Sequence, residues 1–544
     1  MKVTGKIFDF EKRQFLNGQI TIENGVIHSI EAIDGEFENF ILPGLIDSHV
    51  HIESSMLTPS RFAELIVPRG TVAVVSDPHE IANVVGKDGV GYMIDDSRKV
   101  PLKCFFGVPS CVPATEVEGA GAVLNAKEVA ALIQREDIWF LSEMMNFPGV
   151  LGGDLDVLGK LNAAKSVGKP IDGHAPGLRG EGLKKYIAAG ITTDHECFSL
   201  DDALEKISLG MKIQIREGSA AKNFEALHSL LSLYPDRVMF CTDDSHPDTI
   251  LESGHMDRIV RMAIKKGYSI FDILQVCSVN PVFHYSLPVG LLRVGDPADF
   301  IVVDNLSDFN IIETYIDGEC VARKGNALFS SSAPQLINNF NCSEITCSDI
   351  HVDIPSGASS LKVMIVQDGE LLTGQMDYLL NKGFSELQMQ DHDILKLVVV
   401  DRYNDCAKNP AVAFVHGFGL KRGALASSVS HDNHNIIAVG CSDDEIVKAV
   451  NLVIQHRGGV VLVDGDRQEQ ILPLPIAGII SDKPGTEVAK LYEELNANAK
   501  LMGTSLMSPF MTLSFLSLIV IPKLKLGSKG LFDVSKFHYV PLFD

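Results

Sequence analysis

Eight short apolar segments recur along the first half of the chain at intervals of about thirty residues. Helix-like stretches such as residues 155–167 separate most of them, and Gly168 and Gly190 stand where helices would stop. Strands that alternate with helices in this way form parallel sheets, and eight such units close into a barrel. The sequence therefore predicts an α/β fold with a (β/α)8 barrel, whose strands lie at 41–47, 71–76, 103–108, 138–143, 170–174, 191–195, 212–217 and 238–243.

Strand-rich segments flank the predicted barrel on both sides. Asn17-Gly18 and Asn24-Gly25 are two-residue hairpin signals between alternating apolar positions, and a similar strand pattern returns after residue 285. At 544 residues the chain exceeds a single hydrophobic core. We expect a small β-sandwich domain into which the barrel is inserted, followed by a C-terminal α+β domain that caps the barrel. The expected boundaries are 1–42 with 285–340 for the sandwich, 43–284 for the barrel and 345–544 for the C-terminal domain.

The composition indicates which partners the protein can bind and in which cellular compartment it works. The net charge of −23 repels a phosphate backbone, so we expect no nucleic-acid partner. The ten cysteines are scattered, which is typical of thiols in a reducing compartment, and the N-terminus lacks a signal-peptide core. Residues 501–522 hold no charge over 22 positions, but Gly503, Pro509 and Pro522 favour a buried segment over a membrane span. We therefore expect a cytoplasmic protein with no membrane partner.

Side chains that bind metals stand at the ends of several predicted strands. His49 and His51 follow the first apolar run, and alternate residues of a strand share one face. A lone histidine near a strand end is more often a hydrogen-bonded core residue. Six suitable side chains at the ends of five strands instead favour a pair of divalent cations at the catalytic rim of the barrel. The predicted ligands are His49, His51, Glu143, His174, His195 and Asp243.

Two of these ligands have further predicted roles, and other polar residues remain ambiguous. Each oxygen of Glu143 can reach one cation, and Asp243 could also take a proton from a bound water. Asp77-Pro78 could simply begin a helix, Arg216 and Glu217 could form a structural ion pair, and residues 431–434 could be an ordinary polar loop. The functional alternative makes these groups a substrate-binding set: Asp77, Arg216, Glu217, Asp244, His431 and Asp432.

Longer motifs connect the chain to a known family. The run Pro43-Gly44-Leu45-Ile46-Asp47-Ser48-His49-Val50-His51, followed by His, His and Asp at later strand ends, resembles the amidohydrolase superfamily. Within that superfamily, several motifs look like the adenine deaminase family, and the resemblance covers nearly the whole chain. These motifs are Ser76-Asp77-Pro78-His79-Glu80-Ile81-Ala82-Asn83-Val84, Asp172-Gly173-His174-Ala175-Pro176, Arg216-Glu217-Gly218-Ser219-Ala220-Ala221 and Ser428-Val429-Ser430-His431-Asp432-Asn433-His434-Asn435.

The resemblance implies hydrolytic deamination of free adenine to hypoxanthine and ammonia, a purine-salvage reaction in which a metal-activated hydroxide attacks C6. It implies two divalent ions, Mn²⁺ or Fe²⁺ with Zn²⁺ as an alternative, a small purine base as partner, and a homodimer. Glu143 would bridge the ions, where many relatives use a carboxylated lysine. Asp243 would move the proton from water to the leaving amine. The acid for ring nitrogen N1 is left open among Glu80, His79, Asp244 and His246.

Other functions remain compatible with the same ligands. A cyclic-amide hydrolase of the same superfamily, similar to dihydroorotase or hydantoinase, would need the same residues, and only the longer motifs favour an aromatic amine. A nucleoside deaminase would have to act on adenosine. A metal-free scaffold protein would have no need of six ligands at the strand ends.

Overall fold

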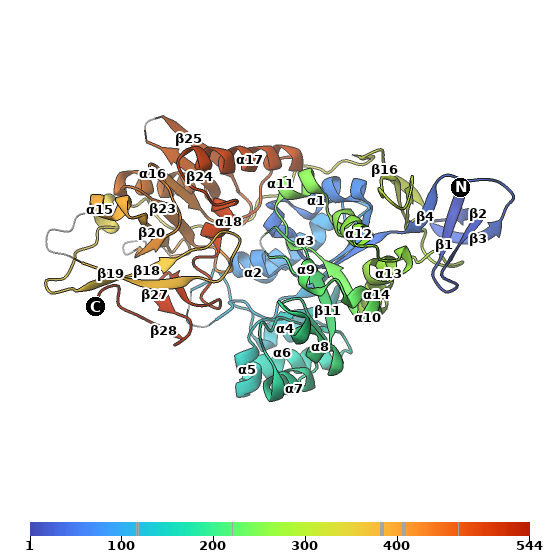
Figure 1. Cartoon of the computed structure of the whole chain (residues 1–544), viewed down its shortest axis with the longest axis horizontal. Coiled ribbons are helices and arrows are strands. Elements are labelled where there is room, and N and C mark those ends of the chain that lie inside the picture. The colour runs from blue at the N-terminus through green and yellow to red at the C-terminus, as the bar shows by residue number, and fades with distance from the viewer. Residues whose placement is uncertain (116, 118, 220, 381–385, 405–409, 466) are drawn as a thin grey trace. The chain divides into compact units, whose positions relative to one another are not determined.

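The computed structural model describes residues 1–544 except 116, 118, 220, 381–385, 405–409 and 466. Its contacts divide the chain into two compact units (Figure 1). The first unit comprises Met1–Pro78, Val90–Cys111 and Leu124–Pro334. The second comprises His79–Gly89, Val112–Val123 and Gln335–Asp544. Two short segments from the barrel region therefore fold with the C-terminal part of the chain.

The predicted barrel is present in the first unit. Its strands are parallel, and they are buried on both faces, which explains their nearly continuous apolar sequences. Thr192 N donates to Ile171 O at 2.9 Å and links β9 to β10, while β13 (Asp243–Asp244) pairs with β5 and closes the ring. In chain order the strands are β5 (Leu45–His51), β6 (Thr71–Ser76), β7 (Lys103–Val108), β8 (Ile138–Met144), β9 (Ile171–Gly173), β10 (Thr193–Asp194), β11 (Lys212–Arg216) and β12 (Val238–Cys241).

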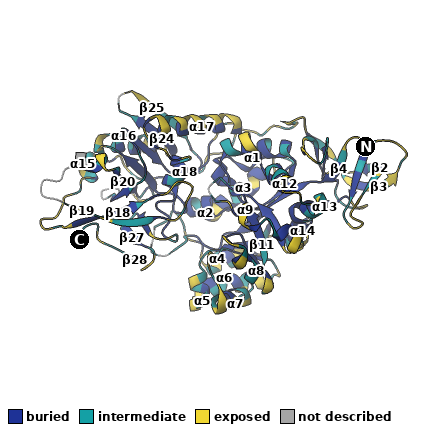
Figure 2. Ribbon diagram, viewed as in Figure 1, coloured by how far each residue is buried: buried dark blue, intermediate teal, exposed yellow. Residues whose placement is uncertain are grey.

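Amphipathic helices cover these strands. In α12 (Met256–Lys265) the buried residues include Met256, Ile259, Val260 and Ala263, the spacing that places side chains on one helical face. Figure 2 shows β11 in the buried colour and exposed residues on α5 and α7. Further helices of this unit are α1 (Pro59–Ile66), α4 (Ala126–Leu132), α5 (Phe147–Gly152), α6 (Leu155–Ser166), α7 (Gly180–Ala188) and α8 (Leu200–Ser208).

The predicted first strand is wrong in its extent. Residues 41–47 are divided between two sheets, because β4 (Phe40–Pro43) joins the small N-terminal sheet and β5 begins at Leu45. Gly44 lies between them, and a Cβ atom there would stand 2.3 Å from a Val72 methyl carbon. The close approach of Val72 therefore requires glycine at the point where the chain passes from one sheet to the other.

The strands on either side of the barrel pair as expected. β4 lies between β1 (Lys2–Asp9) and β14 (Phe300–Val303) in one sheet with the order β17-β16-β15-β14-β4-β1-β2-β3. Its other members are β2 (Gln14–Glu23), β3 (Val26–Ala32), β15 (Ile311–Ile316), β16 (Glu319–Arg323) and β17 (Asn326–Ala327).

One of the two hairpin predictions is wrong. Asn24-Gly25 forms the turn between β2 and β3, with positive φ at both residues. Asn17-Gly18 instead lies inside β2. Gly18 serves a close approach between strands, because a Cβ atom there would stand 2.7 Å from Glu31 O.

A mixed sheet forms the centre of the second unit. Its order is β19-β18-β21-β20-β23-β22-β24-β25, and α16 (Asp443–Gln455) packs on β22, β23 and β24 after an N-cap at Ser442. The α2 (His79–Val85) segment belongs to this unit. Across the described residues, no helix combines the length and the apolar character needed to cross a membrane. The sheet strands are β18 (Ser360–Ile365), β19 (Gly374–Leu379), β20 (Ile394–Val400), β21 (Ala411–His416), β22 (Ala424–Ser427), β23 (Ile436–Gly440), β24 (Gly459–Asp464) and β25 (Gln468–Pro473).

Lys525 in β26 (Leu524–Gly527) should make the stability of the second unit depend on pH. Its ammonium group donates to Leu371 O and Phe515 O at 2.9 Å, and burial lowers its pKa from 10.5 to about 7. Between pH 7 and 10.5 the unfolded chain therefore binds a proton that the folded chain lacks, so this residue's contribution to stability rises with pH.

The variant Lys525→Met should lose this pH dependence. Above pH 7, we expect the unfolding free energy of the parent protein to rise relative to that of the variant, by at most about 1.4 kcal/mol per pH unit. Urea unfolding at pH 7, 8 and 9 measures the difference. Parallel stability curves for the two proteins would contradict the prediction.

Candidate active site

Glu143 is buried near the end of β8, among four histidines. Its Oε1 atom is 3.2 Å from His51 Nε2 and 4.0 Å from His49 Nε2. Its Oε2 atom is 2.7 Å from His174 Nδ1 and 3.3 Å from His195 Nε2. The two carboxylate oxygens therefore face different pairs of histidines, which is the arrangement that a carboxylate shared by two cations requires.

Asp243 completes this group from the other side of His49 and His51. Its Oδ1 atom is 3.1 Å from His51 Nε2 and 3.5 Å from His49 Nε2. The backbone of Asp243 has a φ of 55°, an uncommon value for a residue with a side chain and one that concentrates at functional sites. The structure thus brings all six residues of the predicted ligand set into one place.

The unpartnered nitrogens of this group suit metal ions. His49 is fully buried, yet neither of its ring nitrogens has a hydrogen-bond partner among the described residues. Buried polar groups are normally hydrogen-bonded, so both atoms need an explanation. Ligand atoms of His49, His51 and Asp243 lie within 4.8 Å of one another, as do those of His49, Glu143 and His195. Imidazole and carboxylate donors at this spacing fit neighbouring divalent cations.

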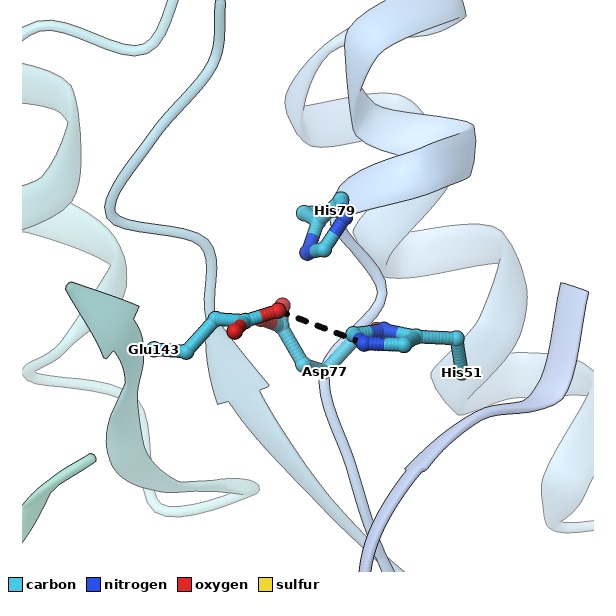
Figure 3. A group of neighbouring side chains, drawn as sticks. All are labelled: His51, Asp77, His79 and Glu143. Carbon is cyan, nitrogen blue, oxygen red and sulfur yellow. Dashed lines mark hydrogen bonds and ion pairs between the residues drawn. The ribbon is translucent and has the colours of Figure 1, made fainter. Parts of the chain in front are cut away.

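The orientation of His51 is set by a backbone group. His51 Nδ1 is 3.0 Å from the Asp77 carbonyl oxygen, which leaves Nε2 directed at Glu143. Figure 3 shows the ion pair between His51 and Glu143 with Asp77 beside them. A hydrogen bond from the second ring nitrogen to a carbonyl is the usual support of a metal-binding histidine.

Asp47 links β5 to the segment before β13, where the barrel closes. It accepts hydrogen bonds from the Thr242 backbone N at 3.1 Å and the Thr242 hydroxyl at 2.5 Å. It also accepts one from the His49 backbone N at 3.3 Å and lies 3.2 Å from His255 Nε2. Asp47 therefore fixes the segments that carry His49 and Asp243 relative to each other.

Arg216 occupies a buried position between two carboxylates. Its Nη1 atom is 2.5 Å from Glu196 Oε1 and 2.6 Å from Asp243 Oδ2. Burial tends to raise the pKa of Asp243, but Arg216 and the adjacent histidines hold this pKa well below its ordinary value. The guanidinium group thus keeps Asp243 ionised and fixes one of its oxygens, so that the other faces His49 and His51.

These contacts correct the pairing considered from sequence. Arg216 pairs with Glu196 and Asp243 rather than with Glu217, whose side chain accepts from Phe224 N at 3.2 Å. Burial raises the pKa of Glu217. Glu196 is absent from the predicted site, although its place directly after His195 at a strand end was a usable signal. Its Oε1 atom lies 3.6 Å from His195 Nε2 and 3.7 Å from His174 Nδ1.

The remaining predicted residues of the first unit follow Asp243. The Asp244 carboxylate accepts from the Ser54 hydroxyl at 2.5 Å. His246 is buried, and its backbone N donates to the Ser219 hydroxyl at 2.9 Å. Asp244 therefore ends β13, and His246 lies in the hydrogen-bonded segment that follows it.

A second polar cluster lies within the second unit. Glu80 accepts from His431 Nδ1 and, at 2.5 Å, from His434 Nε2. His79 Nε2 lies 3.6 Å from Glu80 Oε1 and 3.9 Å from Asp432 Oδ1. Four predicted site residues thus come together here, and His434 joins them without having been predicted.

Two protein-family models match this chain, one in its N-terminal part and one in its C-terminal part. The amidohydrolase family model matches residues 40–321, and the model of the adenine deaminase C-terminal domain matches residues 371–538. An adenine deaminase of Methanosarcina barkeri is 54% identical, with the alignment covering 99% of this chain and 98% of that protein. An adenine deaminase of Sulfurovum sp. is 52% identical over 99% of both chains, and one of Salinibacter ruber is 49% identical over 99% of this chain and 98% of that protein.

This chain belongs to the adenine deaminase family. The resemblance stated from its motifs is thereby confirmed. The amidohydrolase match contains every residue from His49 to Asp243, and the C-terminal match contains His431 and His434. The two matched ranges therefore span both clusters, and a scaffold or a cyclic-amide hydrolase is not favoured.

Proposed function

We propose that this protein hydrolyses adenine to hypoxanthine and ammonia. The observation that carries the proposal is the position of Glu143 between two pairs of histidines with Asp243 beside one pair, in a chain 54% identical to a protein named adenine deaminase. The rim of a (β/α)8 barrel is where such enzymes carry out their chemistry.

The proposed centre takes two divalent cations, Mn²⁺ or Fe²⁺, with Zn²⁺ as an alternative. One cation would be held by His49, His51 and Asp243. The other would be held by His174 and His195, and Glu143 would bind both cations. Divalent cations in such a site lower the pKa of water toward neutrality, which supplies the nucleophile.

Asp243 is the proposed proton carrier. The Arg216 contact keeps its carboxylate ionised and therefore able to accept a proton as water adds to C6 of the purine. The same carboxyl group then gives the proton to the amine, which leaves as ammonia. The second proton of the water goes to N1 of the ring, and Glu80, His79, Asp244 and His246 are the candidates for carrying it there. The buried contacts of Arg216 support a role in holding Asp243 instead of the predicted contact with substrate.

Ammonia release from adenine tests the proposal. We expect turnover of adenine, no turnover of adenosine and no ring opening of hydantoin or dihydroorotate. A chelator should abolish the activity, and Mn²⁺ or Fe²⁺ should restore it. Hydrolysis of a cyclic amide without adenine turnover would overturn the assignment. Less than one ion per chain after expression with Mn²⁺ would favour a scaffold.

A homodimer and a cytoplasmic location form part of the same proposal. Both follow from the family resemblance and the scattered cysteines. Light scattering coupled to gel filtration tests the first, and fractionation of the source cells tests the second.

A further inference from the structure

Both oxygens of the Glu80 carboxylate are held by imidazoles from one short loop. Glu80 lies in the first turn of α2 and is buried. His431 Nδ1 contacts one of its oxygens and His434 Nε2 the other. A carboxylate held at both oxygens cannot rotate without breaking a hydrogen bond. Burial tends to raise the pKa of Glu80, but the two histidines hold it well below its ordinary value.

The ring of His434 is fixed as a hydrogen-bond donor. Its Nδ1 atom accepts from the Ser430 backbone N at 3.3 Å, so in the neutral ring the proton stands on Nε2 and points at Glu80. Burial lowers the pKa of His434 to about 4, so the ring is neutral near pH 7. The loop therefore offers Glu80 a donor of defined tautomer.

The ring of His431 is fixed by packing. It stacks on Phe515 with ring centroids 4.4 Å apart and an interplanar angle of 13°. Its backbone N donates to Ser514 O at 2.9 Å. Tyr403 OH also donates to Asn433 O at 2.5 Å, which anchors the loop between the two histidines. The loop is thus built to present both imidazoles in one arrangement.

We infer that His431 and His434 are positioning residues that orient the Glu80 carboxylate for the proposed deamination. The inference rests on the proposed function, in which Glu80 is a candidate for proton exchange with the purine ring. Glu80 Oε1 lies near both His431 and His79, whereas Oε2 accepts from His434; a carboxylate oxygen has two lone pairs, so one on Oε2 remains for a ring N–H. His431, predicted from sequence to bind substrate, would then act through Glu80.

A series of variants at position 434 tests the inference. Leucine fills similar space without a donor, whereas the amide of glutamine can donate to Glu80. We expect His434→Leu to lower kcat by about 10- to 100-fold with KM and the content of two Mn²⁺ per chain unchanged. We expect His434→Gln to recover most of the lost kcat. Steady-state kinetics and metal analysis on the full chain provide these values.

Two further variants separate positioning from a general loss of stability. Val453 is buried in α16, and Val453→Ala should weaken the second unit while leaving kcat unchanged. In a Glu80→Gln background, His434→Leu should cost little further activity, because it acts through Glu80. If the parent enzyme turns over adenine and folded His434→Leu matches it, the inference is wrong. If the metal-loaded parent releases no ammonia from adenine, the proposed function fails and the inference falls with it.

Discussion

Replacing Glu143 with glutamine is expected to remove both metal binding and adenine deamination. The carboxylate faces a different pair of histidines with each oxygen, and glutamine has only one acceptor oxygen and no charge. A shared ligand cannot be lost without weakening both sites. We expect the metal content to fall below one ion per chain and kcat to fall by about 10³-fold or more, which corresponds to about 4 kcal/mol. Metal analysis and ammonia release measure the two effects.

Glu136→Gln is the matched control for this variant. It removes the same charge from an exposed position of the first unit and should leave metal content and kcat unchanged. Full activity in Glu143→Gln would remove Glu143 from its proposed role. Loss of activity with two ions still bound would restrict Glu143 to the chemical step.

The variant Arg216→Met is expected to destabilise the first unit strongly. Methionine keeps much of the buried stem but leaves Glu196 and Asp243 without their cation. Removing one partner of a buried ion pair typically costs about 3–5 kcal/mol, because the remaining charge stays buried. Asp243 would also lose the contact that fixes one of its oxygens, so we expect deamination to fall by about 100-fold. Denaturant unfolding and ammonia release measure these effects.

Arg98 provides the comparison, because it also contacts two carboxylates but is 58% exposed at its side chain. Arg98→Met should cost about 1 kcal/mol or less, since water screens surface ion pairs. If Arg216→Met cost no more stability than Arg98→Met, the buried carboxylates near Arg216 would tolerate its absence.

The sequence predicts the barrel well because of how parallel strands are buried. β6 and β7 match the predicted runs residue for residue, since strands covered on both faces are apolar almost throughout. The prediction of one strand at 41–47 was wrong because the apolar run continues through two sheets. Gly44, which Val72 approaches closely, is the single residue between β4 and β5. The turn predicted at Gly18 was also wrong, because a glycine needed for a close contact between strands cannot be told from one needed for a turn by sequence alone.

The ligand set follows from strand ends, whereas supporting contacts depend on distant partners. His49, Glu143 and Asp243 stand where a barrel carries its chemistry, so their positions in the sequence are informative. The role of His434 depends on Glu80, which lies 354 residues away in the sequence. No local pattern encodes such a contact. The pairing of Arg216 with Glu196 and not with its neighbour Glu217 is likewise decided by the folded chain.

The inclusion of residues 79–89 and 112–123 in the second unit limits how members of this family can be recombined. Asn339 Nδ2 donates to Val84 O and to Gly121 O, each at 3.2 Å, so one side chain joins both segments to the C-terminal half. A chimera made by a single crossover near residue 334 would pair each segment with a foreign counterpart. A hybrid that exchanges the C-terminal half must therefore carry both segments from the same parent.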